Sequence, residues 1–475
     1  MPLRSARNRP VGTLILTTLL ALGNGCSDPL PPELGGIAGT VTDAEDDAPI
    51  VGASVTAGGS STTTSVDGRF VVSNIPVGNY SMDVEAADYI GVASTVSIAA
   101  NAQTKRDVAL PRDCLGPGSG DAIQSRLTSL GSQVALCPGS EVALTSAIEF
   151  TNDNKQLRTW GYPTGDERAL LYLSPGAGGS ALELRDRSDV VISHLRIDGR
   201  IAELGPADDG GALIQAGGTA SGQVIRSVEA GNTRTWTIIH LAEGDEDAGG
   251  CRNATVEDGV FGPARGLGVY DWADGISLAC RSSTIRNNVI FDPSDGGIVI
   301  FGAPGSVVEG NTIRATNHQL LGGINLVDYG PYDGDYTGTI VRNNIVDAAG
   351  ARIQIGIAMG VRVWICFNPE DRGDLPEDPT LRGATVIGNT LQGDFMGYGF
   401  AISGVQNWTA TDNVDLATHS GQPKNTCNGE LAAAPSGFQI SGALSAGTFQ
   451  AEFQQARLEL ALWSVDDPPQ IPVRR

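Results

Sequence analysis

The sequence predicts an all-β protein in which a small antiparallel β-sandwich precedes a long parallel β-helix. Two observations predict this fold class. Glycine supplies 63 of 475 residues and charged residues only 18%, a composition that favours short strands and tight turns over helices. In the second half of the chain one strand motif, Gly-apolar-x-apolar, returns six times at intervals of roughly 20–45 residues, and repeats of this length are typical of a solenoid.

Residues 1–25 are predicted to be a secretory signal, because Arg4, Arg7 and Arg9 precede an apolar stretch that is too short to span a membrane. The stretch ends in Gly25-Cys26, which resembles the cleavage site of bacterial lipoproteins. This resemblance implies that Cys26 is lipidated and that the mature protein is exported to the outer membrane or cell surface, with the lipid as its membrane anchor. Secretion without an anchor is the alternative.

The formal net charge of −23 limits the partners that we expect. Loss of the three signal arginines makes the mature chain still more negative. Such a surface repels nucleic acid and anionic lipid, so we do not expect nucleic acid as a partner. Separately, we expect a glycan partner and a monomeric protein.

Six cysteines remain once Cys26 is set aside, and an even number in an exported chain predicts disulfides. Six cysteines allow 15 connectivities. Pairing between neighbours is the one that we expect, because each bond then closes a local loop. The expected pairs are Cys114 with Cys137, Cys251 with Cys280 and Cys366 with Cys427.

Residues 26–35 form a Pro-rich tether, and residues 36–111 show short alternating strands with turn signals between them. Asp67-Gly68 predicts a hairpin. The runs GTVTD (39–43), PIVGASVT (49–56) and VDGRFVV (66–72) resemble the carboxypeptidase regulatory-like domain. The resemblance implies a β-sandwich without catalytic residues, which serves as a spacer or as a sugar-binding module.

Residues 112–450 are predicted to form the β-helix, and residues 451–475 a C-terminal tail. The strand motif begins at GISL (275–278), and a second motif ends in an asparagine that we expect to stack from coil to coil, at Asn288, Asn311, Asn344, Asn389 and Asn413. We expect those asparagines to adopt the left-handed backbone of the turns. About 330 residues at ~25–30 per coil predict roughly 11–12 coils.

A helix over residues 121–130, with Ala122, Ile123, Leu127 and Leu130 on one face, is expected to cap the first coil. The run from Ala273 to Ile313 is typical of the right-handed parallel β-helix of the pectin-lyase-like superfamily, which the chain from about residue 114 to 450 resembles. The resemblance implies the fold and leaves the activity open.

Polar residues gather on consecutive coils between residues 265 and 335. Glycosidases need two carboxyl groups roughly 5–5.5 Å or ~6.5–9.5 Å apart, and coils ~4.8 Å apart can supply either spacing. Asp274 and Asp295 are the best pair, although Asp-Gly is also ordinary turn chemistry. The catalytic candidates are Asp274, Asp295, Asp271, Asp328 and Arg265. The substrate-binding candidates are Tyr270, Trp272, Asn325, Tyr329 and Tyr332.

Two reaction types remain open for these residues. A lyase would use Arg265 or Arg352 as base, because the three lysines lie elsewhere. The sequence requires no cofactor, but Asp271, Asp295 and Asp328 could bind Ca²⁺. We therefore expect a protein that acts on polysaccharide as a hydrolase, lyase or epimerase. A surface adhesion or glycan-binding protein that uses the β-helix as a rigid rod is the alternative.

The lipidation of Cys26 can be tested by metabolic labelling with a palmitate analogue. The wild-type protein should incorporate the label and remain with the membrane fraction. Cys26→Ser should lose both properties, because only the thiol of that residue can accept the lipid. Equal release of the two proteins into the medium would contradict the anchor.

Overall fold

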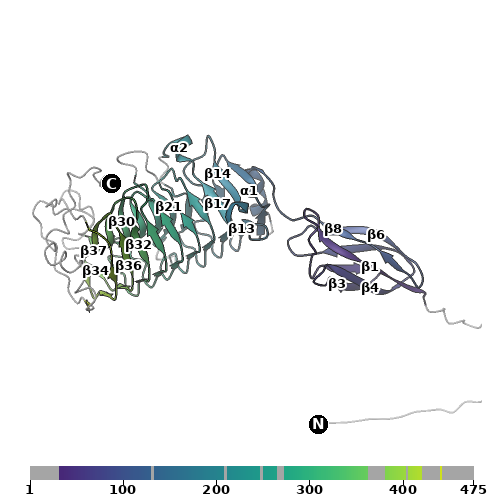
Figure 1. Cartoon of the computed structure of the whole chain (residues 1–475). Helices are drawn as coiled ribbons and strands as arrows, with labels where there is room; N and C mark the ends of the chain where they lie inside the picture. Colours follow the sequence, from purple (N-terminus) through teal and green to yellow (C-terminus); the bar gives the residue numbers. More distant parts are fainter. Residues whose placement is uncertain are drawn as a thin grey trace, which may run out of the picture. The chain divides into compact units, whose positions relative to one another are not determined.

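The computed structural model describes residues 32–129, 133–207, 211–245, 250–264, 272–361, 380–402, 405–419 and 439–440. The chain divides into two compact units between Pro111 and Arg112 (Figure 1). Each unit has its own core of buried aliphatic side chains. Within the described ranges, no helix is both long and apolar enough to cross a bilayer.

The first unit is a β-sandwich of two four-stranded sheets. One sheet contains β1 (Leu34–Asp43), β4 (Arg69–Pro76), β7 (Gln103–Lys105) and β8 (Val108–Leu110). The other contains β2 (Ser54–Ala57), β3 (Ser60–Thr63), β5 (Gly78–Glu85) and β6 (Val92–Ile98). The pairing is antiparallel except that β7 and β8 run parallel to β1. The first sheet therefore contains both antiparallel and parallel pairs. After β6, at the edge of the second sheet, the chain crosses back to the first sheet and pairs with β1.

The Asp67-Gly68 turn forms, but the hairpin predicted there is wrong. Gly68 has a φ of 72°, and its backbone N–H donates to the carbonyl of Ser65. The strands on either side of the turn, β3 and β4, pair with β2 and β1 in different sheets. The turn therefore carries the chain from one layer of the sandwich to the other.

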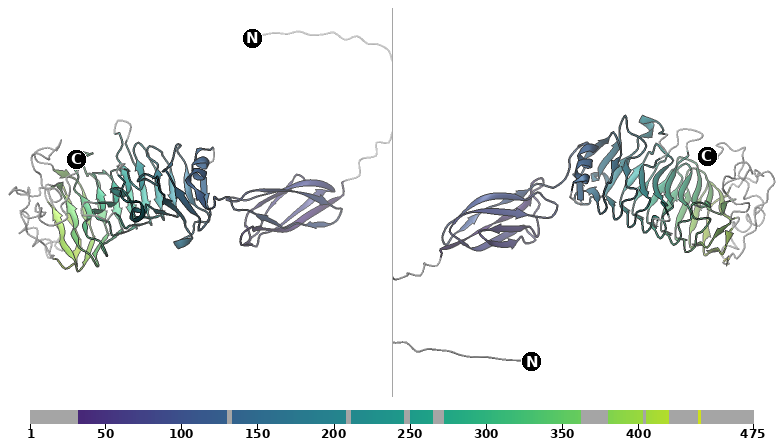
Figure 2. Two further views of the ribbon diagram at one scale, coloured as in Figure 1. Left: turned by 90° about the horizontal axis from the view of Figure 1, so that it is seen from above. Right: turned by 180° about the vertical axis from the view of Figure 1, so that it is seen from behind.

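The second unit is a parallel β-helix built from three long sheets, which we call sheets I, II and III (Figure 2). Sheet I consists of β10 (Gln133–Leu136), β13 (Gln156–Thr159), β16 (Val191–Ser193), β19 (Val224–Arg226), β22 (Thr255–Glu257), β25 (Thr284–Arg286), β28 (Val307–Glu309), β31 (Ile340–Arg342), β35 (Thr385–Ile387), β39 (Thr409–Thr411) and β41 (Gln439–Ile440). Sheet II consists of β9 (Gly118–Ser119), β11 (Glu141–Leu144), β14 (Ala169–Leu173), β17 (Leu195–Asp198), β20 (Glu229–Gly231), β23 (Val260–Phe261), β26 (Val289–Phe291), β29 (Thr312–Arg314), β32 (Ile345–Ala348), β36 (Thr390–Gly393) and β40 (Val414–Asp415). Sheet III consists of β12 (Ile148–Glu149), β15 (Leu182–Glu183), β18 (Ile214–Gly217), β21 (Thr237–Ala242), β24 (Asp274–Leu278), β27 (Gly296–Ile300), β30 (Leu320–Leu326), β33 (Ile353–Met359) and β37 (Met396–Ile402).

Three short elements complete the β-helix within the described residues. They are the helix α2 (Ile201–Leu204), a 3-10 turn at Gly165–Glu167, and a two-stranded sheet of β34 (Leu381–Arg382) and β38 (Val405–Gln406). The two eleven-stranded sheets agree with the number of coils that the repeat spacing predicts.

Parallel in-register pairing stacks equivalent side chains inside the β-helix. In sheet I the inward position is filled successively by Ile192, Ile225, Val256 and Ile285, and all are fully buried. Ile298 and Ile300 of sheet III are likewise buried, as the alternation of the motif predicts. Burying such a side chain contributes about 1.5–3 kcal/mol, and the stacks repeat that contribution in each coil.

The glycine of the repeated motif is required by the close approach of sheet III to sheet II. A Cβ atom on Gly275 would lie 2.5 Å from Cγ2 of Ile290 and 2.6 Å from the carbonyl oxygen of Gly297. The equivalent atom on Gly297 would lie 2.5 Å from Cγ2 of Ile313. A methyl group has no room at this position, so the motif keeps glycine and lets the side chain of the facing strand fill the space.

The predicted asparagine ladder is confirmed at the turn between sheets I and II. The side-chain amide of each member donates to Oδ1 of the next, with distances of 2.9–3.0 Å along Asn288, Asn311, Asn344, Asn389 and Asn413. The left-handed backbone, however, belongs to the preceding residue and not to the ladder itself. Asn287 and Asn343 have φ of 57° and 56°, and glycine takes that place at Gly310 and Gly388.

A helix, α1 (Gly120–Thr128), lies against the first coil as expected for a cap. Ile123 and Leu127 are buried against the core. Ala122 is exposed, so the apolar face is narrower than the sequence predicts, and Leu130 lies outside the described residues.

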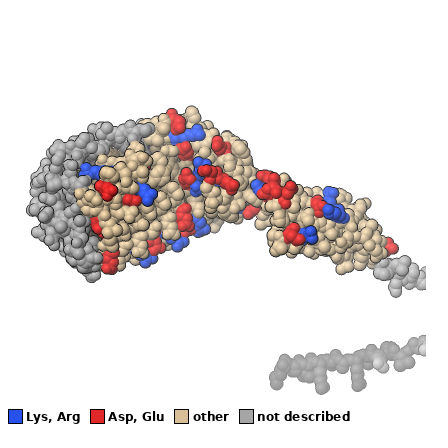
Figure 3. All heavy atoms as spheres, in the orientation of Figure 1, with Lys and Arg blue, Asp and Glu red and all other residues tan. Residues whose placement is uncertain are grey.

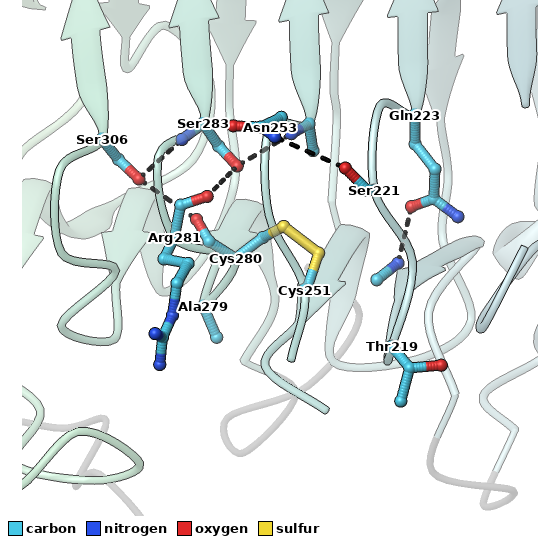
Figure 4. The surroundings of a disulfide bond; sticks show 12 residues. Thr219, Ser221, Gln223, Cys251, Asn253, Ala279, Cys280, Arg281, Ser283 and Ser306 are labelled. Atoms are coloured by element: carbon cyan, nitrogen blue, oxygen red, sulfur yellow. Dashed lines mark hydrogen bonds between the residues drawn. A yellow bond between two sulfur atoms is a disulfide. The ribbon is translucent and has the colours of Figure 1, made fainter. Parts of the chain in front are cut away.

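Two of the three expected disulfides are confirmed. Cys114 pairs with Cys137 beside the cap helix, and Cys251 pairs with Cys280 on the next coil. Figure 4 shows the second bond beside a short serine ladder, in which Ser306 Oγ accepts from the backbone N–H of Ser283 at 3.0 Å. Cys366 and Cys427 lie outside the described residues, as does Cys26, so the third pair remains a prediction.

The asparagine ladder predicts a large cost for one substitution. Asn311→Ala removes the acceptor of Asn288 and the amide that donates to the carbonyl of Ile285. Because each buried polar group left without a partner costs about 1–3 kcal/mol, the free energy of unfolding should fall by about 3 kcal/mol. Chemical denaturation measures it. Asn287→Gly is the control, since other coils already have glycine there, and an equal loss in both variants would contradict the ladder's role.

Candidate functional site on the outer face of sheet III

The outer face of sheet III carries a row of mostly polar side chains along the β-helix, from β12 to β30. They are held outward because their neighbours in the strands, such as Ile239, Leu241 and Ile276, point into the core. Successive positions of this row, in register, are Glu149, Glu183, Gln215, His240, Ser277, Val299 and Asn325. We call this row the sheet III row.

Asp274 lies beside the sheet III row and is hydrogen-bonded to Ser277 of that row. Its Oδ2 accepts a hydrogen bond from Ser277 Oγ at 2.8 Å, and its Oδ1 accepts from the backbone N–H of Gly296 at 2.9 Å. Ser277 Oγ also lies 2.9 Å from Oγ1 of Thr237. Asp274 is completely buried. Three neighbouring coils therefore hold this carboxylate in one orientation.

Asp295 follows on the next coil but is displaced by one residue. Ile276 pairs with Ile298, so the residue level with Asp274 is Gly296, and Asp295 comes one residue earlier. The backbone N–H of Asp295 donates to Ala273 and its side chain is largely buried. The structure thus places the two carboxylates on consecutive coils, with the difference in register that the sequence already indicates.

Asn325 is the residue of the row with unused hydrogen-bonding capacity. It is fully buried, and neither its Oδ1 nor its Nδ2 has a hydrogen-bond partner in the described part of the chain. A Cβ atom on Gly296 would lie 2.2 Å from Cγ2 of Val299, 2.9 Å from Asn325 Nδ2 and 3.1 Å from Asp274 Oδ1. The glycine is therefore closely surrounded, and the amide and the carboxylate lie near each other beside it.

His240 and Trp236 add aromatic surface to the same face. His240 Nδ1 lies 3.0 Å from Gln215 Nε2, an amide group that donates, so the neutral ring carries its proton on Nε2. The ring of Trp236 meets His240 edge-on, with 4.8 Å between centroids. Trp272 is half-buried, and its Nε1 is buried without a hydrogen-bond partner among the described residues.

Glu183 has a perturbed titration within the row. Burial raises the pKa of its carboxyl above the ordinary value of 4.5, and the nearby charge of Glu149 adds to this, against the opposing effect of Arg185. Sequence reasoning missed Glu183, Gln215 and His240, because the strands that carry them lack the Gly-apolar-x-apolar motif.

The remaining predicted residues are placed differently from one another. Tyr332 packs onto the β-helix, with 8% of its surface exposed, and its hydroxyl donates to the carbonyl of Ala279 at 2.7 Å. Tyr329 is half-buried against the core, and Asp328 accepts at its backbone carbonyl from the hydroxyl of Tyr336. Arg265, Tyr270 and Asp271 lie outside the described residues. The side chain of Tyr332 is therefore part of the packing of the β-helix.

The sequence also predicts a possible base, Arg352, and a possible calcium site. Nε and Nη2 of Arg352 are buried without hydrogen-bond partners among the described residues. In the same part of the chain, no group of three or more His, Cys, Asp or Glu side chains is arranged to hold a metal ion. Figure 3 shows acidic and basic side chains interspersed over the β-helix.

Two family models match the chain. Residues 36–111 match the carboxypeptidase regulatory-like domain, and residues 247–415 match the right handed beta helix region. The chain carries both domains. These matches confirm the sandwich and the β-helix that the two sequence resemblances imply. No curated protein matches the chain.

Solved structures that are similar to this chain include an epimerase module, a tailspike protein and an adhesin. The mannuronan C-5 epimerase AlgE6 A-module of Azotobacter vinelandii is 17% identical, covering 69% of this chain and 97% of that chain, with a TM-score of 0.41. A tailspike protein mutant of E. coli bacteriophage HK620 is 13% identical, covering 70% and 62%, with a TM-score of 0.47. The Streptococcus pneumoniae surface protein and adhesin PfbA is 10% identical, covering 68% and 92%, with a TM-score of 0.40.

The raised pKa of Glu183 predicts a pH-dependent effect on stability. The folded protein keeps this proton to a higher pH than the unfolded chain, so the group destabilises the fold as the pH rises above about 4.5. Glu183→Gln should therefore melt at a higher temperature than the wild type at pH 7. The two melting temperatures should converge at pH 4, where both side chains are neutral. A constant difference across this range would contradict the burial of the charge.

Proposed function

We propose that the protein is an exported, lipid-anchored β-helix protein that binds polysaccharide along the sheet III row and acts on it as a hydrolase, lyase or epimerase. The observation that carries the proposal is the nearness, beside Gly296, of the Asp274 carboxylate and the Asn325 amide, which has no hydrogen-bond partner among the described residues. Sugar hydroxyl groups both donate and accept hydrogen bonds, so they match a carboxylate and an amide that lie close together.

The surroundings of these two groups suit a sugar chain in two further respects. Trp236 and His240 bring flat rings to the same face, and such rings stack on the apolar faces of sugars. The row repeats at the spacing of the strands, ~4.8 Å per coil. An extended polymer that lies along the row would thus meet polar groups at all of its positions except Val299.

The proposed chemistry assigns the acid and base roles to consecutive coils. Asp274 and Asp295 are the carboxylate pair, and adjacent strands place their backbones at the spacing that a two-carboxylate glycosidase needs. Ser277 and the N–H of Gly296 orient Asp274 through its two oxygens. Gln215 holds the basic Nδ1 of His240, so this ring offers its Nε2–H to a glycan as a hydrogen-bond donor.

A non-catalytic glycan-binding rod is the second candidate, and one observation favours it. Asp274 is completely buried and accepts hydrogen bonds from Ser277 and Gly296, which are interactions within the fold. If those bonds are the whole role of Asp274, its loss will lower stability and leave glycan affinity unchanged in the folded protein.

Asp274→Asn separates the two candidates. Turnover should fall about 10²–10⁴-fold if the carboxylate is catalytic, while the amide oxygen still accepts from the N–H of Gly296. The assay is a polysaccharide panel that reads both new reducing ends and unsaturated uronate absorbance. Ser277→Ala is the matched control, because it removes the hydrogen bond to the carboxylate and keeps the acid. Turnover within a few-fold of wild type in Asp274→Asn and Asp295→Asn would support the rod.

A further inference from the structure

The first two positions of the sheet III row are glutamates on neighbouring strands. Glu149 of β12 pairs in register with Glu183 of β15, so two acidic side chains leave the same face of the sheet from backbones ~4.8 Å apart. Glu149 is exposed and Glu183 is half-buried. A ligand can therefore reach both carboxylates, whereas Asp274, further along the same face, is completely buried.

This pair of glutamates lacks the arginines that neutralise an outward glutamate on another face of the β-helix. In sheet I the carboxylate of Glu257 accepts hydrogen bonds from Arg226 and Arg286, which lie on the coils before and after it. In the sheet III row no position holds a lysine or an arginine. Neither Glu149 nor Glu183 forms an ion pair within the described ranges. A cation from outside the fold could therefore take the place that the arginines have in sheet I.

The titration of Glu183 reflects this negative surrounding. Burial raises the pKa of its carboxyl, and the charges of Glu149 and Asp186 raise it further. The charge and the backbone N–H of Arg185 lower the pKa, but they do not cancel the rise. A positively charged group beside the two glutamates would be stabilised by both of them.

Gln215 gives an independent indication of a ligand at the same place. It follows Glu183 in register, on β18, and only 3% of it is exposed. Its Nε2 lies 3.0 Å from Nδ1 of His240, whereas its Oε1 accepts no hydrogen bond from the described residues and still reaches the surface. A nearly buried amide is thus fixed at one end and presents an unused acceptor next to the carboxylate of Glu183.

An ammonium group matches the chemistry of these side chains. It has three N–H donors and no acceptor, whereas ionised carboxylates and an amide oxygen only accept. The rings of Trp236 and His240 are half-buried on the coil that follows Gln215 and meet edge-on, with 4.8 Å between their centroids. They offer a surface on which a sugar ring that carries the amine can stack.

We propose that the glycan bound along the sheet III row is a polymer of amino sugars with free amines, and that Glu149, Glu183 and Oε1 of Gln215 hold one of its ammonium groups. This inference rests on the proposed function, which leaves the sugar unnamed. The net charge of −23 acts in the same direction, because it attracts a polycation and repels a polyuronate. An amino sugar has no carboxylate to acidify a neighbouring C–H group, so hydrolysis is the one of the three proposed reaction types that applies to such a polymer.

The test measures binding to the full mature chain by isothermal titration calorimetry at pH 6, where the amines of a glucosamine oligomer are largely protonated. The probes are this oligomer, its N-acetylated counterpart of equal length, and a galacturonate oligomer. The glucosamine oligomer should bind about tenfold more tightly than the N-acetylated one, because hydrogen bonds between charged groups are the stronger ones. The galacturonate oligomer should bind most weakly.

Glu149→Gln and Glu183→Gln test the position of the site. Each should weaken the binding of the glucosamine oligomer about tenfold and leave that of the N-acetylated oligomer within a few-fold. Glu183→Gln should fold, since it removes a charge that burial disfavours. Glu141→Gln is the matched control, because it changes the net charge equally at an exposed position of sheet II on the same coil as Glu149. It should leave all three affinities unchanged.

The outcomes distinguish a failure of this inference from a failure of the proposed function. Equal affinity for the two glucosamine oligomers, or tighter binding of the galacturonate oligomer, overturns the amino-sugar assignment and leaves glycan binding in place. A lysine oligomer of equal charge that binds as tightly as the glucosamine oligomer shows attraction between net charges and also overturns the assignment. So does an equal loss in Glu141→Gln. If none of the three glycans binds, the glycan binding of the proposed function fails together with the inference.

Discussion

The structure of the second unit depends on parallel strands that pair in register at one fixed spacing. Because each coil repeats the one before it, every position of a strand becomes a line of like-placed side chains along the molecule. A buried polar side chain is then tolerated when its neighbours on the line satisfy it. Asn288 and Asn311 do this with their amides, and Glu257 does it with two arginines. The glycine line at Gly275 and Gly297 follows from the same constraint, since a Cβ atom at one coil would meet the backbone of the next.

This constraint also explains why breaks in a line are informative. In the sheet III row, apolar Val299 separates Ser277 from Asn325, so the amide of Asn325 has no neighbour of its own kind to bond. Asn325 is fully buried, so water does not compensate its amide as it would at an exposed site. A complete line satisfies its own polar groups, whereas an interrupted line leaves a buried amide without a partner among the described residues.

The sequence predicts those features of the β-helix that repeat, and it misses those that do not. The strand motif, the asparagine ladder and two local disulfides recur or lie close together in the chain, so their spacing reveals them. Glu183 and His240 occupy the same row as Ser277, but the coils between them differ in length, and only the pairing of β15, β18, β21 and β24 brings them into line. The packing of Tyr332 depends on the hydrogen bond from its hydroxyl to the carbonyl of Ala279, which lies 53 residues away in the chain. No local sequence pattern shows this contact.

The fixed spacing bears on how such a scaffold can become an enzyme. Strands ~4.8 Å apart restrict the separation between outward groups to a few values, and among those values are the separations that two catalytic carboxylates need. A rod that binds glycan and an enzyme that cleaves it can therefore share one backbone and differ in which outward positions hold acids. Asp274 and Asp295 differ by one residue in register, so their side chains start from unequal heights on adjacent coils. Under the proposed function, this offset would give the two carboxylates different surroundings, which is what an acid and a base need in order to act as distinct groups.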